Sequence, residues 1–179
     1  MVDPSVRDSR LPARAQIVEY LGSERDGGFA EFVAVPSVNA HVIDSPLSDA
    51  ELATFPCSYD TAEEMLVRAD LREGETILIT GAAGGVGTAL IQLAHVRGAR
   101  VVAVAGQSKR ERLEALGADY FVARDSADLK QSVEALVGEQ GIDVVADVVG
   151  GNLFDPILKV LRRGGRYTTA GAIGGPITT

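Results

Sequence analysis

The chain has 179 residues, enough for one ordinary hydrophobic core and a small appendage. It is 46% hydrophobic and 23% charged, as in globular proteins, and its net charge of −8 argues against a nucleic-acid partner. It contains no apolar run of membrane-spanning length and no apolar signal core near its first residue, so we expect a cytoplasmic protein without a membrane partner.

The first part of the chain predicts short strands in a largely irregular background. Apolar and polar residues alternate over residues 29–35 (FAEFVAV), a pattern typical of a half-buried strand. Two further short strands are predicted within residues 15–21 (AQIVEYL) and 41–43 (HVI).

Two helical segments are predicted before residue 75. Ser48, with Glu51 three residues later, has the spacing of a capping box at a helix N-terminus. Residues 59–71 (YDTAEEMLVRADL) have helical spacing. We interpret Asp60 as a carboxylate at the N-terminus of that helix, where the helix dipole favours it, and Tyr59 as a packing residue.

From residue 76 onward, short β-branched runs alternate with helical segments. The runs are TILIT, RVVAVA, DYFVA, IDVVADVV and GRYTTAGA, at residues 76–80, 100–105, 119–123, 142–149 and 165–172. The segments between them carry apolar residues at helical spacing, and most end at glycine. This alternation predicts an α/β fold, a doubly wound parallel (Rossmann) sheet with right-handed crossovers.

A glycine-rich turn, residues 81–87 (GAAGGVG), separates the first of these strands from the helical segment that follows it. Unpaired N–H groups and the dipole at a helix N-terminus favour an anion, and glycines let a pyrophosphate approach the backbone. The spacing Ala82-x-Gly84-x-x-Gly87 is that of a dinucleotide fingerprint whose first glycine is replaced. We predict a nucleotide site here; the alternative is a turn that only packs a helix on a strand.

Two other nucleotide-binding classes require residues that this chain lacks. A Walker-type phosphate loop needs a lysine after its last glycine, and the turn contains none. The short-chain dehydrogenase pattern TGxxxGxG matches residues 80–87, but that class also needs a tyrosine with a lysine four residues later. The four tyrosines are followed at that distance by Glu24, Glu63, Arg124 and Gly171.

The end of the second predicted strand indicates which dinucleotide is bound. NAD enzymes carry an acidic residue about 20 residues after the glycine turn, where it binds the ribose hydroxyls. Residues 88–110 contain no Asp or Glu, and the strand is followed by Gln107, Ser108, Lys109 and Arg110. Either cation could pair with a 2′-phosphate, so we predict NADP(H) over NAD(H). The alternative is that both cations form the solvated first turn of the next helix.

Several motifs together resemble one family. ILITGAAGGVGTALIQLA, GIDVVADVVGG and LRRGGRYTTAGA are similar to the cofactor domain of the medium-chain dehydrogenase/reductase superfamily, which covers zinc alcohol dehydrogenases and zinc-free quinone oxidoreductases. Upstream, GGFAEFVAVP and LATFPCSYDTAEEMLVRADLREGE also resemble it, so the resemblance extends over residues 28–179.

The resemblance implies roles for particular residues. The cofactor straddles the glycine turn, and the nicotinamide lies beside Thr61 and near the ends of the fourth and fifth strands. Cys57, the only cysteine, lies where zinc-dependent members carry the third ligand of a catalytic zinc. The implied cofactor residues are Gly84, Gly85, Val86 and Gly87 in the turn, and Val148, Val149, Gly150, Ala170, Gly171 and Ala172 at the strand ends.

The chain also departs from the family pattern. We expect residues 1–50 to be a remnant of the family's GroES-like substrate domain plus a linker, and residues 51–179 to be the Rossmann domain. The other zinc ligands come from the missing part, so zinc is expected only in a full-length parent, and the alternative for Cys57 is a small buried residue at a helix start. The sheet is expected to lack the family's sixth strand, which leaves the fifth as an exposed edge and predicts a homodimer through it.

These features lead to two functional hypotheses. In the first, the chain is the NADP(H)-binding portion of an oxidoreductase that transfers hydride between the cofactor and a small-molecule alcohol, carbonyl or quinone, and the isolated chain is inactive. In the second, it is a stand-alone dinucleotide-binding sensor or interaction module. No acid–base pair can be named. Asp147 in the fourth strand either points to the cofactor side or is paired within the sheet; alternation alone leaves both open.

Overall fold

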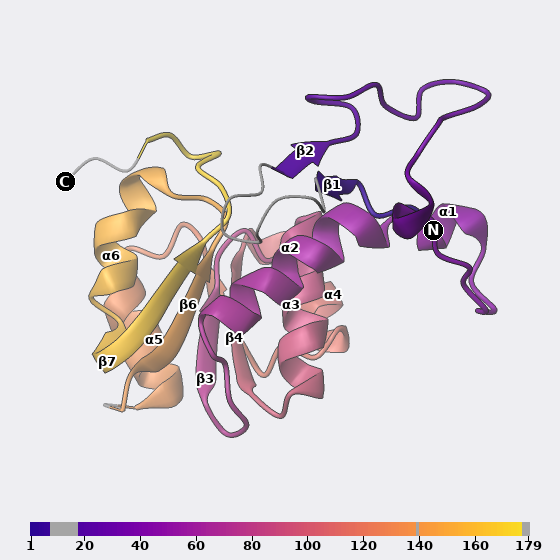
Figure 1. The fold of residues 1–179 in the computed structure, drawn as a ribbon. Helices are drawn as coiled ribbons and strands as arrows, with labels where there is room; N and C mark the ends of the chain where they lie inside the picture. The colour runs from indigo at the N-terminus through magenta and orange to yellow at the C-terminus, as the bar shows by residue number, and fades with distance from the viewer. Residues whose placement is uncertain (8–17, 139, 177–179) are drawn as a thin grey trace. The chain divides into compact units, whose positions relative to one another are not determined.

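The computed structural model describes residues 1–7, 18–138 and 140–176, and the chain divides into two compact units (Figure 1). The first unit is Met1–Cys57 and the second is Ser58–Thr179, so the division falls inside helix α2 (Phe55–Arg68).

The elements that the structure describes in the first unit before α2 are short. Strands β1 (Ser5–Arg7) and β2 (Val18–Tyr20) pair antiparallel, and β2 confirms the strand predicted within residues 15–21, of which 15–17 lie outside the described residues. Buried Asn39, in the 3-10 turn η2 (Ser37–Asn39), donates its side-chain N–H groups to the carbonyls of Asp3 and Ser5 at 3.1 and 2.8 Å.

The strands predicted at residues 29–35 and 41–43 are wrong. The structure has no strand in either segment, and Phe29, Phe32 and Val42 are exposed to solvent. A period-2 pattern produces a strand only where a neighbouring strand accepts its N–H groups and its apolar face is covered. Neither condition is met for these segments among the described residues.

The two predicted helices before residue 75 both form. Ser48 caps α1 (Asp49–Leu52), accepting from the Glu51 N–H at 3.3 Å while the Glu51 carboxylate accepts from the Ser48 N–H at 2.8 Å, so the capping box is confirmed. Helix α2 begins at Phe55, earlier than predicted. Asp60 therefore lies in the interior of α2, and its interpretation as an N-terminal carboxylate is wrong.

The second unit is built on one parallel sheet of five strands in the order β5-β4-β3-β6-β7. All four neighbouring pairs are parallel, and the chain leaves β3 first to one side and then to the other, which confirms the predicted doubly wound α/β fold. The strands are β3 (Thr76–Ile79), β4 (Arg100–Ala105), β5 (Tyr120–Ala123), β6 (Ile142–Asp147) and β7 (Leu161–Thr169).

Helices cover both faces of this sheet (Figure 1). Ile77 and Ile79 of β3 belong to one buried cluster, with residues of α2, α3 and α4, whereas Leu78 belongs to a second cluster with residues of α5 and α6. Strands buried on both faces explain why the runs are apolar throughout rather than alternating. The remaining elements are α3 (Gly85–Val96), η3 (Gln107–Lys109), α4 (Arg110–Ala115), α5 (Leu129–Val137), η4 (Gly151–Leu153) and α6 (Phe154–Leu158).

Strand β7 forms one edge of the sheet. It pairs with β6, and no other described strand pairs with it. The register shifts between Ile142 and Val144 of β6, so the Arg162–Gly165 segment of β7 bulges. None of the helices in the described residues is long and apolar enough to cross a membrane.

Candidate functional site

The glycine turn follows β3 and lies against the loop that follows β6. Gly81 has φ of 55°, in the left-handed region that favours glycine. A methyl group at Gly81 would lie 2.6 Å from Cγ2 of Val148 and 3.2 Å from Cγ2 of Val149. The two predicted cofactor segments therefore touch, and only a residue without a side chain fits between them.

The turn leads into the N-terminus of α3, where no side chain caps the helix among the described residues. Gly84 is the N-cap residue and offers no side-chain cap; the first helical bond runs from the Thr88 N–H to the Gly84 carbonyl at 2.9 Å. The N–H groups of Gly85, Val86 and Gly87 therefore have no intrahelical acceptor. Together with the helix dipole, they make an anion-binding end on a helix of 12 residues.

The glycines of the turn differ in what surrounds them. A methyl group at Gly87 would lie 2.6 Å from Cα of Ala82, so Gly87 lets the helix pack tightly on the turn. At Gly84 the methyl group would meet one atom of the described, non-adjacent residues within 4 Å, the Gly81 carbonyl oxygen at 3.4 Å. Gly84 thus leaves an open approach to the backbone, while Gly87 serves packing.

The loops after β6 and β7 also meet. A methyl group at Gly150 would lie 3.2 Å from Cα of Ala172, and one at Gly171 would lie 3.1 Å from the Val148 carbonyl oxygen. The Gly174 N–H donates to the Val149 carbonyl at 2.7 Å. The structure therefore brings together the two segments predicted to flank the nicotinamide, 148–150 and 170–172.

Asp147, the last residue of β6, sits fully buried beneath these loops. Its carboxylate accepts hydrogen bonds from the hydroxyls of Thr80 and Tyr167 and from the N–H groups of Val149 and Gly150. Of the two alternatives, pairing within the protein is the one that the structure shows.

These contacts set the protonation of both partners. Burial acts to raise the pKa of Asp147, but the hydrogen bonds from Thr80, Tyr167 and the two N–H groups outweigh it and hold the pKa below its ordinary value. Burial, followed by the hydrogen bond to Asp147 and its charge, raises the pKa of Tyr167 to about 12. At neutral pH the cluster therefore holds an ionised carboxylate and a neutral phenol.

The residues predicted to select the dinucleotide follow β4. Gln107, Ser108, Lys109 and Arg110 are all exposed, with the first three in η3 and the last beginning α4. The Arg110 guanidinium is engaged: its Nε donates to Glu114 at 2.7 Å, and its Cζ lies 5.9 Å from the centre of the Phe121 ring.

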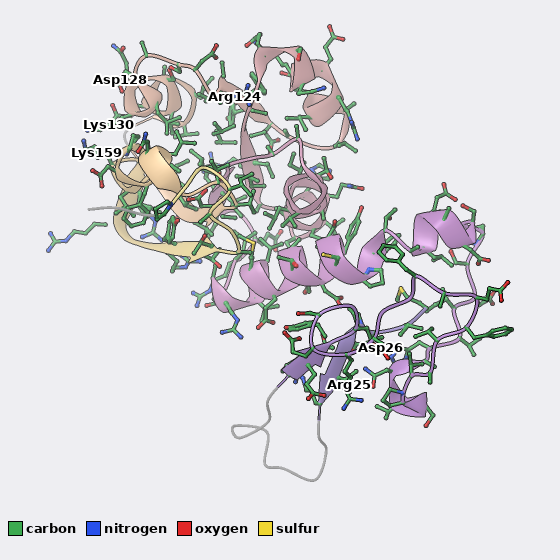
Figure 2. All side chains as sticks on the ribbon, turned by 90° about the horizontal axis from the view of Figure 1, so that it is seen from above. Arg25, Asp26, Arg124, Asp128, Lys130 and Lys159 are labelled. Atoms are coloured by element: carbon green, nitrogen blue, oxygen red, sulfur yellow. The ribbon has the colours of Figure 1, made fainter. Side chains whose placement is uncertain are left out.

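Arg124 is a cation at this edge that sequence reasoning missed (Figure 2). It directly follows β5, and its N–H donates to the carbonyl of Ala105, the last residue of β4, at 2.8 Å. Its side chain is exposed, and Nε lies 4.0 Å from where a methyl group at Gly106 would be. The strand order β4-β5 is the signal that could have found it, because parallel strands end at the same edge.

Helix α2 supplies polar groups beside the N-terminus of α3. A methyl group at Gly85 would lie 2.6 Å from the Ser58 hydroxyl oxygen, and the Tyr59 hydroxyl accepts from the Gln92 side chain at 3.0 Å. Tyr59 thus has the packing role predicted for it. Thr61 is half-buried on α2, one turn beyond Ser58, which the sequence analysis did not single out.

The described residues do not fit a metal centre. Cys57 is exposed, so the interpretation of it as a small buried residue is wrong. His95 is exposed on α3 beside Gly117, and in the part of the chain that the structure describes no three His, Cys, Asp or Glu side chains gather to hold a metal ion.

Comparison with known proteins finds one matching family and several similar chains. The zinc-binding dehydrogenase family matches residues 85–179. Bovine (Bos taurus) quinone oxidoreductase-like protein 2 is 38% identical over 155 residues, which are 85% of this chain and 44% of that protein. The chloroplastic NADPH-dependent alkenal/one oxidoreductase of Arabidopsis thaliana is 37% identical over 159 residues, 88% of this chain and 38% of that protein.

A solved structure covers the chain completely. The crystal structure of a candidate alcohol dehydrogenase from Sinorhizobium meliloti 1021 is 53% identical, with a TM-score of 0.94 over 100% of this chain and 49% of that one. The chain thus spans less than half the length of these relatives.

Proposed function

The chain belongs to the zinc-binding dehydrogenase family, and on that basis we propose that it binds NADP(H) as the cofactor portion of an oxidoreductase. The observation that carries the proposal is the N-terminus of α3, which has no side-chain cap, behind Gly84, with the loop after β6 lying against the glycine turn and the loop after β7 lying against the loop after β6. A relative with the name NADPH-dependent alkenal/one oxidoreductase supports the choice of cofactor.

The residues divide into three parts of one site. The N–H groups of Gly85, Val86 and Gly87 would hold the pyrophosphate, and the exposed side chains after β4 and β5 would hold the adenosine end. Residues 148–150 and 170–172, with Thr61, would flank the nicotinamide. When bound, NADP(H) supplies or accepts a hydride at its nicotinamide ring.

The preference for NADP(H) rests on Lys109 and Arg124. Both are exposed, neither takes part in an ion pair among the described residues, and no carboxylate occurs in residues 88–110 to repel a 2′-phosphate. Arg110 contributes less, because Glu114 already neutralises its guanidinium. The sequence predicted Lys109 and Arg110 as the cations that pair with the 2′-phosphate. The proposal keeps Lys109 and replaces Arg110 with Arg124.

A titration of the purified protein with NADPH and with NADH, at one salt concentration, tests this proposal. We expect tighter binding of NADPH, and about tenfold weaker NADPH binding in Lys109→Ala and Arg124→Ala with NADH binding unchanged, because a charge-assisted bond is lost. Arg110→Ala is the matched control and should stay within about twofold. Equal affinity for the two dinucleotides would refute the preference, and binding of neither would refute the site.

The activity of the whole protein is the wider part of the proposal. We propose hydride transfer between NADP(H) and an alcohol, carbonyl or quinone, with catalysis requiring a protein wall that holds a small-molecule substrate against the nicotinamide and excludes water. The described residues before α2 form short elements and do not provide such a wall, so we expect no turnover from this chain alone. Turnover of an aldehyde or quinone by the purified chain, followed as NADPH oxidation, would overturn that expectation.

A further inference from the structure

Three consecutive N–H groups of the loop after β6 point into the protein. The Val148 N–H donates to the Thr80 hydroxyl at 3.1 Å, and the N–H groups of Val149 and Gly150 donate to Oδ1 of Asp147 at 2.8 and 3.1 Å. The Gly150 N–H is shared with Oδ2, at 3.2 Å. Gly150 has φ of 63°, which lets the chain turn back over the carboxylate. The loop is therefore folded around the side chain of the residue that precedes it.

The Asp147 carboxylate also connects two other strands. The Thr80 hydroxyl, directly after β3, donates to Oδ1, the oxygen that accepts from both loop N–H groups. The Tyr167 hydroxyl, on β7, donates to the other oxygen at 2.7 Å. One buried carboxylate thus joins the beginning of the glycine turn, the loop after β6 and the strand that leads to residues 170–172.

The charge of Asp147 is what makes these bonds strong. No cation is among its described hydrogen-bond partners, so four neutral donors stabilise a fully buried negative charge. Bonds to an ionised acceptor are roughly twice as strong as bonds between neutral groups. An amide in the same place would turn an NH2 group toward donors and could not satisfy them all.

We infer that Asp147 is a positioning residue for the nicotinamide half of the bound dinucleotide, acting through the N–H groups of residues 148–150 and through Thr80. The inference rests on the proposed function. The inference predicts an effect at one end of the dinucleotide, which a general stabilising role does not predict. The adenosine end of the proposed site lies after β4 and β5, and none of the described hydrogen bonds of Asp147 extends there.

The test uses two ligands that share the adenosine end. Adenosine 2′,5′-bisphosphate carries the 2′-phosphate but no nicotinamide, whereas NADPH carries both. Calorimetric titrations compare the wild-type protein with Asp147→Asn, Thr80→Val and Thr80→Ser. We expect NADPH to bind about tenfold more weakly or worse to Asp147→Asn and Thr80→Val, from the loss of a bond to a charged group, while the bisphosphate stays within about twofold.

Thr80→Ser keeps the hydroxyl and should bind NADPH like the wild type, which separates loss of the bond from a change of packing. If Asp147→Asn does not fold, the comparison of Thr80→Val with Thr80→Ser tests the inference by itself. Equal weakening of both ligands, or unchanged NADPH binding in Thr80→Val, overturns the inference, as does a wild type that binds NADPH no tighter than the bisphosphate. A wild type that binds neither ligand refutes the proposed function instead.

Discussion

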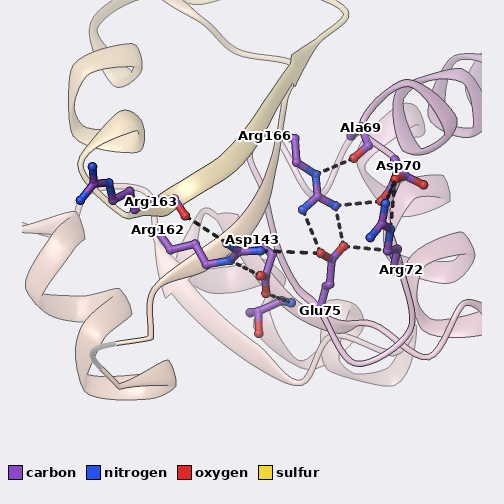
Figure 3. Close-up of polar contacts among 9 residues, drawn as sticks. Ala69, Asp70, Arg72, Glu75, Asp143, Arg162, Arg163 and Arg166 are labelled. Atoms are coloured by element: carbon purple, nitrogen blue, oxygen red, sulfur yellow. Dashed lines mark hydrogen bonds and ion pairs between the residues drawn. The ribbon is translucent and has the colours of Figure 1, made fainter.

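Arg166 of β7 forms a bidentate ion pair with Glu75, the residue before β3. Its Nη1 and Nη2 donate to the two carboxylate oxygens at 2.8 and 2.6 Å, although the residues are 91 positions apart (Figure 3). The same guanidinium donates to the carbonyls of Ala69 and Asp70 after α2, at 2.9 and 2.8 Å. One side chain therefore ties the edge strand to the centre of the sheet and to the end of a helix.

Removal of this guanidinium should destabilise the fold. We expect Arg166→Ala to lower the free energy of unfolding by about 2–4 kcal/mol, because a partly buried carboxylate and two carbonyls lose their donors. Arg166→Lys should recover only part of the lost unfolding free energy, because an ammonium cannot reproduce the planar arrangement of guanidinium donors. Arg163→Ala, at an exposed position on the same strand, is the control and should change stability by less than about 0.5 kcal/mol. Urea unfolding measures all three, and equal effects at 163 and 166 would contradict the assignment.

Acid should destabilise the folded protein by protonating carboxylates whose pKa values are lowered in the folded state. The hydrogen bonds from Arg166 hold the pKa of Glu75 below its ordinary 4.5, and the pKa of Asp147 also lies below its ordinary 3.8. Because the folded state binds these protons less readily, their contribution is present above the ordinary pKa values and is lost as pH falls through the folded ones. Unfolding free energies measured between pH 7 and 3 should be flat at first and then decline below about 4.5. Glu75→Gln should reduce the slope of that decline; an unchanged slope would argue that other carboxylates cause it.

Alkaline pH should destabilise the folded protein by ionising Tyr167. Its pKa is raised from 10.0 to about 12, so its contribution to stability is full below pH 10 and is lost as pH rises through the folded value. The ultraviolet absorbance of phenolate, measured as the difference between wild type and Tyr167→Phe, should show one phenol that ionises with a pKa of about 12. A difference that appears near pH 10 would show that the Asp147 bond does not persist in solution.

Two glycines of the turn should respond differently to the same added methyl group. At Gly87 it meets backbone atoms of Ala82, so Gly87→Ala should destabilise the fold by about 1–3 kcal/mol. At Gly84 it makes an ordinary contact with the Gly81 carbonyl oxygen at 3.4 Å, so Gly84→Ala should fold normally yet bind NADPH more weakly, because the pyrophosphate can no longer approach the backbone. Thermal unfolding and NADPH titration separate the two effects. Gly84→Ala with wild-type affinity would place the pyrophosphate elsewhere.

The edge strand β7 should pair two copies of the chain. The Ala170 N–H donates inward to the Asp147 carbonyl, so the neighbouring Thr169 directs its N–H to the open edge. Sedimentation should give a dimer mass for the wild type and a monomer mass for Thr169→Pro, because proline removes that donor. A wild type that sediments as a monomer would refute the homodimer.

Much of the fold could be predicted because local chemistry decides it. Apolar β-branched runs that alternate with amphipathic segments predict parallel strands buried on both faces, and all five strands overlap the runs. The last boundary is wrong, because β7 begins at Leu161, inside the segment predicted to be helical, and ends at Thr169. The capping box at Ser48 involves atoms three residues apart, and it formed as predicted. The strand predicted from the alternation in residues 29–35 is wrong, because a strand depends on a distant partner that its own residues do not specify.

The residue types in the glycine turn and the absence of an acidic residue in 88–110 are properties of the sequence by itself, and they were enough to predict a dinucleotide site and its preference. Only the tertiary structure decided that Arg110 is engaged by Glu114, that Arg124 reaches the same edge, and that Asp147 turns inward to Thr80 and Tyr167. The physical reason is that a carboxylate or guanidinium takes its charge state and direction from donors and acceptors that the fold brings from distant parts of the chain.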